Sequence, residues 1–214
     1  MQIRFDHLVV AARSLAEGTT WLESHLGVPL AGGGRHEAMG THNRLLSLGP
    51  GRYLELIAID PEGTPPGRAR WFDLDSPAMQ QRLAREPALV TWAVRADDIE
   101  AALPVTAAGR PDILPMSRGA YRWRIGVPAS GALAQAGTSP TVIEWLSEHP
   151  SAALPDSGCR LEKLLLVHRE APAMLGVLRA AGFDLGEPVA ARRDGAQGLE
   201  AHLRTPRGIV QIRG

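Results

Sequence analysis

An order of one strand, one helix and three further strands recurs along this chain, and it limits the fold more than any other feature of the sequence. Residues 3–11 are dense in β-formers. An amphipathic helical pattern follows, with Ser14 as its N-cap and Glu17 three residues on, and it stops at Gly27, where a helix C-cap glycine belongs. The short Val28-Pro29-Leu30 and a loose loop at Gly32-Gly33-Gly34 come next. Two more β-like runs, 43–48 and 53–59, follow and are joined by a glycine- and proline-containing turn. We interpret residues 3–60 as one βαβββ unit.

The same order of elements returns further along the chain. After a connector rich in proline and glycine at 61–86, residues 87–149 again read as strand, short helix and three strands, and a weaker repeat spans 159–214. We predict an α+β fold in which residues 1–150 form a domain of two such units. The third unit is degenerate. Its apolar sheet face must be buried against another element, and its edge strand must be paired or shielded. We expect it either to pack on the first two units or to pair across a homodimer.

Composition excludes several classes of function. Lys+Arg and Asp+Glu number 23 each, so no net positive charge favours nucleic acid as a partner. The single lysine, Lys163, lacks the glycine-rich loop of a P-loop, and the single cysteine, Cys159, excludes an intrachain disulfide framework. No apolar run approaches the roughly 18 residues of a membrane span, and the first residues lack the apolar stretch of a signal peptide. We therefore expect a cytoplasmic protein with no membrane partner.

Two motifs that suggest chemistry do not satisfy its requirements. His36 begins a His-Glu pair, but the next histidine, His42, comes too late for the zincin spacing, and the surrounding glycines disfavour the helix that this motif needs. The run Gly32-Gly33-Gly34 precedes no lysine and opens no helix, so it is a poor candidate for a phosphate-binding loop.

Several short stretches resemble one protein family. They include Asp6-His7-Leu8-Val9-Val10 in the first strand, Gly40-Thr41-His42-Asn43, Tyr53-Leu54-Glu55-Leu56-Ile57, Arg70-Trp71-Phe72, Thr91-Trp92-Ala93 and Ile143-Glu144-Trp145. With the repeated βαβββ order, they resemble the vicinal oxygen chelate superfamily, and within it the glyoxalase-like domain proteins. The resemblance implies that two units pair into a cupped, partly open barrel of mixed β-sheet. The superfamily contains lyases, isomerases, dioxygenases and metal-free binding proteins, so the fold alone does not define the chemistry.

The resemblance also implies where a metal would bind. Ligands in this superfamily come typically from the first and fourth strands of each unit, which correspond here to His7, Glu55 and Glu144. The remaining position falls at Thr91-Trp92, where neither side chain is a good ligand. The implied cofactor is a divalent metal, Zn, Ni, Mn or Fe(II), or none.

Strand alternation gives an independent reason to single out the same three residues. Each is one ionisable group on an otherwise apolar strand face, and an unpaired buried carboxylate costs several kcal/mol. Such a group requires a metal, a cationic partner or a wet cavity. By alternation His7 shares its face with Phe5 and Val9, Glu55 with Tyr53 and Ile57, and Glu144 with Val142 and Leu146. The alternative is that His7 pairs with one of these glutamates, or with an arginine such as Arg124, inside a dry fold.

The leading functional hypothesis is metal-assisted lyase or isomerase chemistry on a small substrate with vicinal oxygens. Glu144 is the first candidate for the base and Glu55 the second. A metal-free protein that binds a small planar molecule is the alternative, and a purely structural or regulatory dimer is a third possibility.

Five further residues are candidates for binding the substrate. Aromatic rings can stack a flat substrate, an arginine can hold a carboxylate, and a histidine and an asparagine before the third strand can reach the mouth of the cup. The alternatives are core packing for the tryptophans, a solvated face for the arginine and an exposed turn for the histidine. The candidates are His42, Asn43, Trp92, Arg124 and Trp145.

Overall fold

The first predicted unit is present in the computed structural model, which describes residues 1–106, 111–184 and 186–214. The Ser14 side chain accepts a hydrogen bond from the Glu17 N–H at the start of the helix, and Gly27 ends that helix with a φ of 72°. The elements of this unit are β1 (Ile3–Ala11), α1 (Leu15–Leu26), β2 (Ala31–His36), β3 (Thr41–Ser47) and β4 (Tyr53–Ile59).

The second unit repeats this order after a partly helical connector. The connector contains a 3₁₀ turn (Trp71–Asp73) and α2 (Pro77–Leu83), and shorter 3₁₀ turns lie at Glu37–Met39, Ala134–Gly137 and Pro150–Ala152. The elements of the second unit are β5 (Ala88–Ala96), α3 (Ile99–Thr106), β6 (Asp112–Arg118), β7 (Tyr121–Val127) and β8 (Thr141–Trp145).

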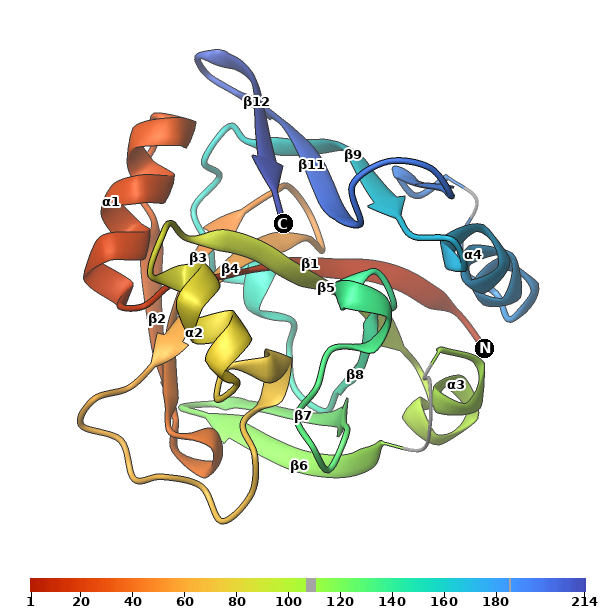
Figure 1. Ribbon diagram of the computed structural model, residues 1–214, viewed down its shortest axis with the longest axis horizontal. Helices are drawn as coiled ribbons and strands as arrows, with labels where there is room; N and C mark the ends of the chain where they lie inside the picture. Colours follow the sequence, from red (N-terminus) through yellow and green to blue (C-terminus); the bar gives the residue numbers. More distant parts are fainter. Residues whose placement is uncertain (107–110, 185) are drawn as a thin grey trace.

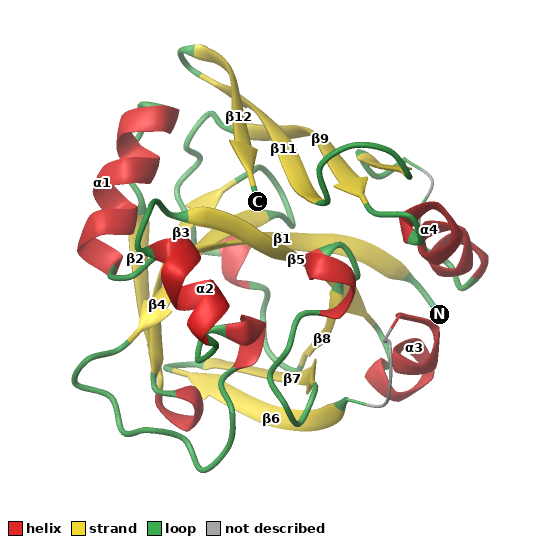
Figure 2. Cartoon of the chain, in the orientation of Figure 1, coloured by secondary structure: helices red, strands yellow, loops and turns green. Residues whose placement is uncertain are grey.

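The two units join edge to edge in one sheet with the strand order β2-β3-β4-β1-β5-β8-β7-β6. Within each unit the first strand runs parallel to the fourth, and the antiparallel pair β1–β5 joins the units. The two edge strands, β2 and β6, contact each other, so the sheet curls into a partly open barrel (Figures 1 and 2). This confirms the predicted cupped α+β architecture.

Both faces of this sheet are apolar, and they belong to two separate cores. We call the concave side the cup interior and the convex side the outer face. The connector helps to fill the interior, because Trp71, Phe72, Met79 and Leu83 pack there. Strand residues of the interior include Val9, Ile57, Val90, Trp123 and Ile143, and those of the outer face include Leu8, Val10, Leu56, Trp92 and Val142.

The third unit packs on the outer face, above β1 and β5 (Figure 1). Its elements are β9 (Arg160–Val167), α4 (Ala171–Ala180), β10 (Val189–Arg192), β11 (Gly198–Thr205) and β12 (Gly208–Arg213). The order of elements repeats, but the sheet order, β10-β9-β11-β12, does not. Here the first strand runs parallel to the second instead of the fourth, so the third unit has a topology of its own. A homodimer stays a prediction.

The glycine run before Arg35 forms part of β2, although the sequence suggested a loose loop. A Cβ at Gly33 would lie 1.9 Å from the carbonyl oxygen of Asn43 on β3, so only glycine permits this approach of the two backbones. None of the helices in the described part of the chain is long and apolar enough to cross a membrane.

Candidate functional site

A β-bulge at Asp6 sets the direction of the first site residue. Phe5 pairs with Val94 and His7 with Ala93, which leaves Asp6 as one extra residue on β1. Phe5 therefore packs in the outer core and Val9 in the interior, although simple alternation places them on one face. His7 lines the interior cavity beside Glu55.

Asp6 is a fully buried carboxylate that organises the groups around it. Its Oδ1 lies 2.6 Å from His7 Nδ1, and its Oδ2 accepts from His149 Nε2 at 3.0 Å and from Trp145 Nε1 at 3.1 Å. Burial by itself would raise the pKa of Asp6, but hydrogen bonds from His149 and His7, with the charges of both rings, bring it well below its usual range. An ionised Asp6 only accepts hydrogen bonds, so His7 Nδ1 is the donor and Nε2 is left to face the cavity.

Asn43 fixes the carboxylate of Glu55. The Gly34 N–H donates to Asn43 Oδ1 at 3.0 Å, which identifies the other end of the amide as the NH₂ group. Asn43 Nδ2 then donates to Glu55 Oε1 at 2.6 Å and lies 3.3 Å from His36 Nε2. Glu55 Oε2 is left 3.7 Å from His7 Nε2. The site thus presents one carboxylate oxygen and one imidazole nitrogen to each other.

His36 is a neutral member of this network. Burial lowers its pKa to about 4, in spite of the opposing charge of Glu55, and the positive charge of Arg118 lowers it further. Its Nε2 accepts from Asn43, so its Nδ1 carries the proton and donates to Thr41 Oγ1 at 3.1 Å. His36 therefore supports Asn43 and does not act as a cation.

Aromatic rings enclose the cavity between these polar groups. The Tyr53 ring stacks on His7 with 4.5 Å between ring centres, and burial raises the pKa of Tyr53 well above its ordinary value, so its phenol stays protonated. The volume of the cavity is about 30 Å³, room for one or two waters. Its other lining residues are Trp71, Phe72, Arg118, Trp123, Ile125, Ile143 and Trp145.

The structure brings four of the predicted site residues together. His7 and Glu55 face each other, Asn43 holds Glu55, and Trp145 lies in the cavity wall. These four come from β1, β4, β3 and β8, so strands from both units contribute to the site.

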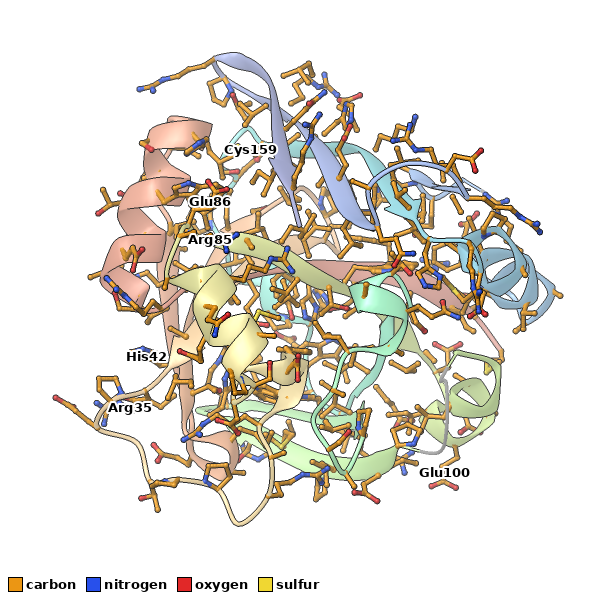
Figure 3. All side chains as sticks on the ribbon, in the orientation of Figure 1. Arg35, His42, Arg85, Glu86, Glu100 and Cys159 are labelled. Atoms are coloured by element: carbon orange, nitrogen blue, oxygen red, sulfur yellow. The ribbon has the colours of Figure 1, made fainter. Side chains whose placement is uncertain are left out.

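Glu144 and Arg124 lie on the outer face, away from this group. Glu144 shares a strand face with Val142, as alternation predicts. That face is the outer face of the sheet, where β8 contacts α3. Arg124 pairs with Glu144 and, at 3.0 Å, with Glu100 of α3, whose position Figure 3 shows. Glu144 is therefore paired with Arg124 on the outer face, and the structure does not bring Glu144 to His7 and Glu55.

Trp92 and His42 also lie outside the cavity. Trp92 is fully buried in the outer core, where its ring stacks on Phe5 and meets the edge of Phe183 from the third unit. His42, labelled in Figure 3, follows a glycine turn and lies near Asp60, with 3.8 Å between His42 Nδ1 and Asp60 Oδ1.

Sequence reasoning missed the groups that hold or complete the site. Asp6 stood beside a predicted ligand, but only a bulge turns two adjacent residues toward one side of a strand. The sequence around His36 indicates only an incomplete zincin motif. Arg118 carries no local signal, because it is the last residue of a strand and precedes a turn. The buried Asp6–His7 pair was the one available hint, since adjacent ionisable residues in an apolar strand need partners.

The donor atoms do not fit a resident divalent metal. A catalytic zinc site has about three protein ligands. Glu144 cannot be one of them here, because it pairs with Arg124 on the outer face, and His36 cannot be one, because its Nε2 accepts a hydrogen bond from Asn43. Only His7 Nε2 and Glu55 Oε2 remain free to face the cavity. Across the described residues, no three His, Cys, Asp or Glu side chains are arranged to hold a metal ion.

Comparisons with known proteins agree with this architecture. A family described as a glyoxalase-like domain matches residues 5–182, and none of the curated proteins matches the chain. A hypothetical protein from Staphylococcus aureus shares 14% identity with a TM-score of 0.56, over 100% of this chain and 85% of that one. Methylmalonyl-CoA epimerase from Mycobacterium tuberculosis shares 19% identity with a TM-score of 0.42, over 70% of this chain and 91% of that one. Because the family match covers most of the sequence, the chain belongs to the glyoxalase-like domain family.

Proposed function

We propose that this protein is an isomerase or lyase that moves a proton at a carbon atom next to a carbonyl group of a small substrate. The observation that carries the proposal is the pair formed by Glu55 Oε2 and His7 Nε2, which face each other across 3.7 Å in a small buried cavity. Each is held from behind by a hydrogen bond, Glu55 by Asn43 and His7 by Asp6. Two positioned acid–base groups on one cavity are what proton transfer to and from carbon requires.

Glu55 is the base in this proposal. Its Oε1 is occupied by Asn43, so Oε2 takes the proton from the carbon atom beside the carbonyl. His7 carries a proton on Nδ1 toward Asp6; in its imidazolium form it also carries one on Nε2, which it donates to the substrate oxygen as Glu55 takes the proton from carbon and recovers when the product forms. A buried carboxylate behind an imidazole keeps it in one tautomer and one orientation. Return of the proton at a new position gives isomerisation, and departure of a neighbouring group gives elimination.

No step of this mechanism passes through a metal ion. A divalent metal held by His7, Glu55 and Glu144 would polarise vicinal oxygens, but the pairing of Glu144 with Arg124 keeps its carboxylate on the outer face. The proposed substrate still carries neighbouring oxygens, because His7, Asn43 and Glu55 present polar atoms to the same cavity.

A metal-free binding protein is the second candidate function. The supporting observation is the wall made by Trp71, Trp123 and Trp145, which offers flat apolar surface to a planar ligand. A protein of this kind would use the same cavity without transferring a proton.

Hydrogen–deuterium exchange at carbon tests the enzyme directly. Protein in D₂O is mixed with hydroxyacetone, 2-oxobutyrate or phenylpyruvate, and loss of the C–H signal is followed by proton NMR against the spontaneous rate. We expect acceleration by the wild type and a loss of about 100-fold or more in Glu55→Gln, the range of general base catalysis. Glu144→Gln is the matched control, since it makes the same change on the outer face.

The outcomes separate the hypotheses. Exchange that survives in Glu55→Gln but disappears in Glu144→Gln would overturn the assignment of the base. Tryptophan fluorescence quenching by these compounds, without exchange in any variant, would support the binding protein instead.

A further inference from the structure

Arg118 is a cation at the site with no anion beside it. It lies at the end of β6, half-buried, and lines both the small cavity and a wider groove outside it. Most arginines near the sheet have a carboxylate partner, but no ion pair within the described residues includes Arg118. Glu55 lines the same cavity and is not within ion-pair distance of it.

The contacts around Arg118 position it without using its N–H donors. Its Cζ lies 5.4 Å from the centre of the Tyr121 ring. On the other side its stem crosses Gly34, where a Cβ would lie 2.8 Å from Arg118 Cδ and 2.9 Å from Cγ. An aromatic face and a missing side chain thus hold the stem and leave the five donors of the guanidinium available.

The electrostatics of the cavity place this charge near the reacting groups. His36 is neutral, because burial lowers its pKa and the charge of Arg118 lowers it further, so it does not compete for an anion. Glu55 and the ionised Asp6 are held by hydrogen bonds from Asn43 and from the His7 and His149 rings. Among the groups that line the cavity, Arg118 is therefore the one left to bind a negative charge.

We infer that Arg118 binds the carboxylate of the substrate and so selects 2-oxo or 2-hydroxy acids over their neutral analogues. The planar fork of a guanidinium matches a carboxylate with two parallel hydrogen bonds. With the carboxylate at Arg118, the oxygen on C2 extends toward His7, the carbon that bears the acidic proton (C3 in a 2-oxo acid, C2 in a 2-hydroxy acid) extends toward Glu55, and the rest of the molecule lies in the outer groove. This inference rests on the proposed function for the position of the reacting carbon.

Binding of a substrate-like acid that cannot react tests the inference apart from catalysis. Benzoylformate is a 2-oxo acid with no C–H beside its carbonyl, and its methyl ester is a neutral analogue of nearly the same shape. By isothermal titration calorimetry we expect the wild type to prefer the acid. Arg118→Gln should weaken binding of the acid about 10- to 100-fold and leave binding of the ester unchanged.

Two further variants separate charge from position. Gly34→Ala keeps the charge but displaces the Arg118 stem, so it should lower the affinity for the acid and spare the ester. Arg44→Gln removes an exposed arginine of β3 and is the matched control, with wild-type affinity expected.

Three results would overturn the inference: equal affinity for acid and ester, no binding of the acid at millimolar concentration, or an unchanged affinity in Arg118→Gln. Inorganic phosphate that competes as well as the acid would also overturn it, because the site would then recognise charge rather than a carboxylate. None of these readings depends on proton transfer, so failure of the proposed function is recognised separately, by the exchange assay on Glu55→Gln.

Discussion

Asn43 Nδ2 lies 2.6 Å from Glu55 Oε1, and this contact leaves the other oxygen of Glu55 to face His7. The orientation of Asn43 follows from the Gly34 N–H, which can only donate. A backbone donor of the glycine-rich edge strand thus sets the direction of a side-chain amide, and the amide sets the direction of the proposed base.

Asn43→Asp should destabilise the protein strongly at neutral pH. It places a second carboxylate beside Glu55 in a buried site, and a buried charge left without compensation costs about 3–5 kcal/mol. The loss should be smaller at pH 5 than at pH 7, because one of the two carboxyl groups takes up a proton and the repulsion is relieved. Urea denaturation at both pH values measures this, and an equal loss at both would contradict it.

His36 should make the folded state less stable as the pH falls from about 6.5 to 4. Burial lowers its pKa to about 4, so between these values the unfolded chain binds a proton that the folded protein does not. The contribution of His36 to the free energy of unfolding has its full value above pH 6.5. It decreases by about 3 kcal/mol as the pH falls to about 4. His36→Gln should flatten the profile of unfolding free energy over this range. A variant profile as steep as that of the wild type would show that other groups cause the dependence.

Trp92→Ala should destabilise the protein by about 3–5 kcal/mol without altering ligand binding in the cup. The ring is fully buried between Phe5 and Phe183, and its Nε1 donates to the Thr138 carbonyl at 2.8 Å. Chemical denaturation and calorimetry with benzoylformate measure the two effects. Trp145→Phe is the comparison, because it changes the cavity wall and should alter binding. Weaker binding of benzoylformate by a folded Trp92→Ala variant would show that Trp92 contributes to the binding site.

Protein purified without chelator or histidine tag should contain far less than one equivalent of transition metal. The reason is the donor set, in which only His7 Nε2 and Glu55 Oε2 are free to face the cavity. Elemental mass spectrometry, before and after incubation with Mn, Fe(II), Ni and Zn, measures it. A stoichiometric metal that Glu55→Ala removes would show that the side chains rearrange into a metal site.

The sequence predicted the units of this fold correctly because each element has a local signal. The Ser14 cap, the Gly27 C-cap and the β-rich runs depend on contacts within a few residues, and the structure confirms them. The topology of the third unit could not be predicted this way. Its elements repeat in order, but strand pairing depends on what lies beside each strand, and there β9 meets β10 and β11.

The same distinction applies to the site. From sequence alone His7 and Glu55 are candidates because an ionisable residue on an apolar strand face needs a partner. Asn43 is a candidate because it can reach the mouth of the cup, and Trp145 because its ring can stack a flat substrate. Only the tertiary structure separated Glu144 from them. Both faces of the eight-stranded sheet are buried, so its strands are apolar on both sides, and alternation cannot distinguish the cup interior from the outer face. The bulge at Asp6 and the position of Arg118 across from Gly34 follow from strand pairing between distant segments, which no local pattern in the sequence records.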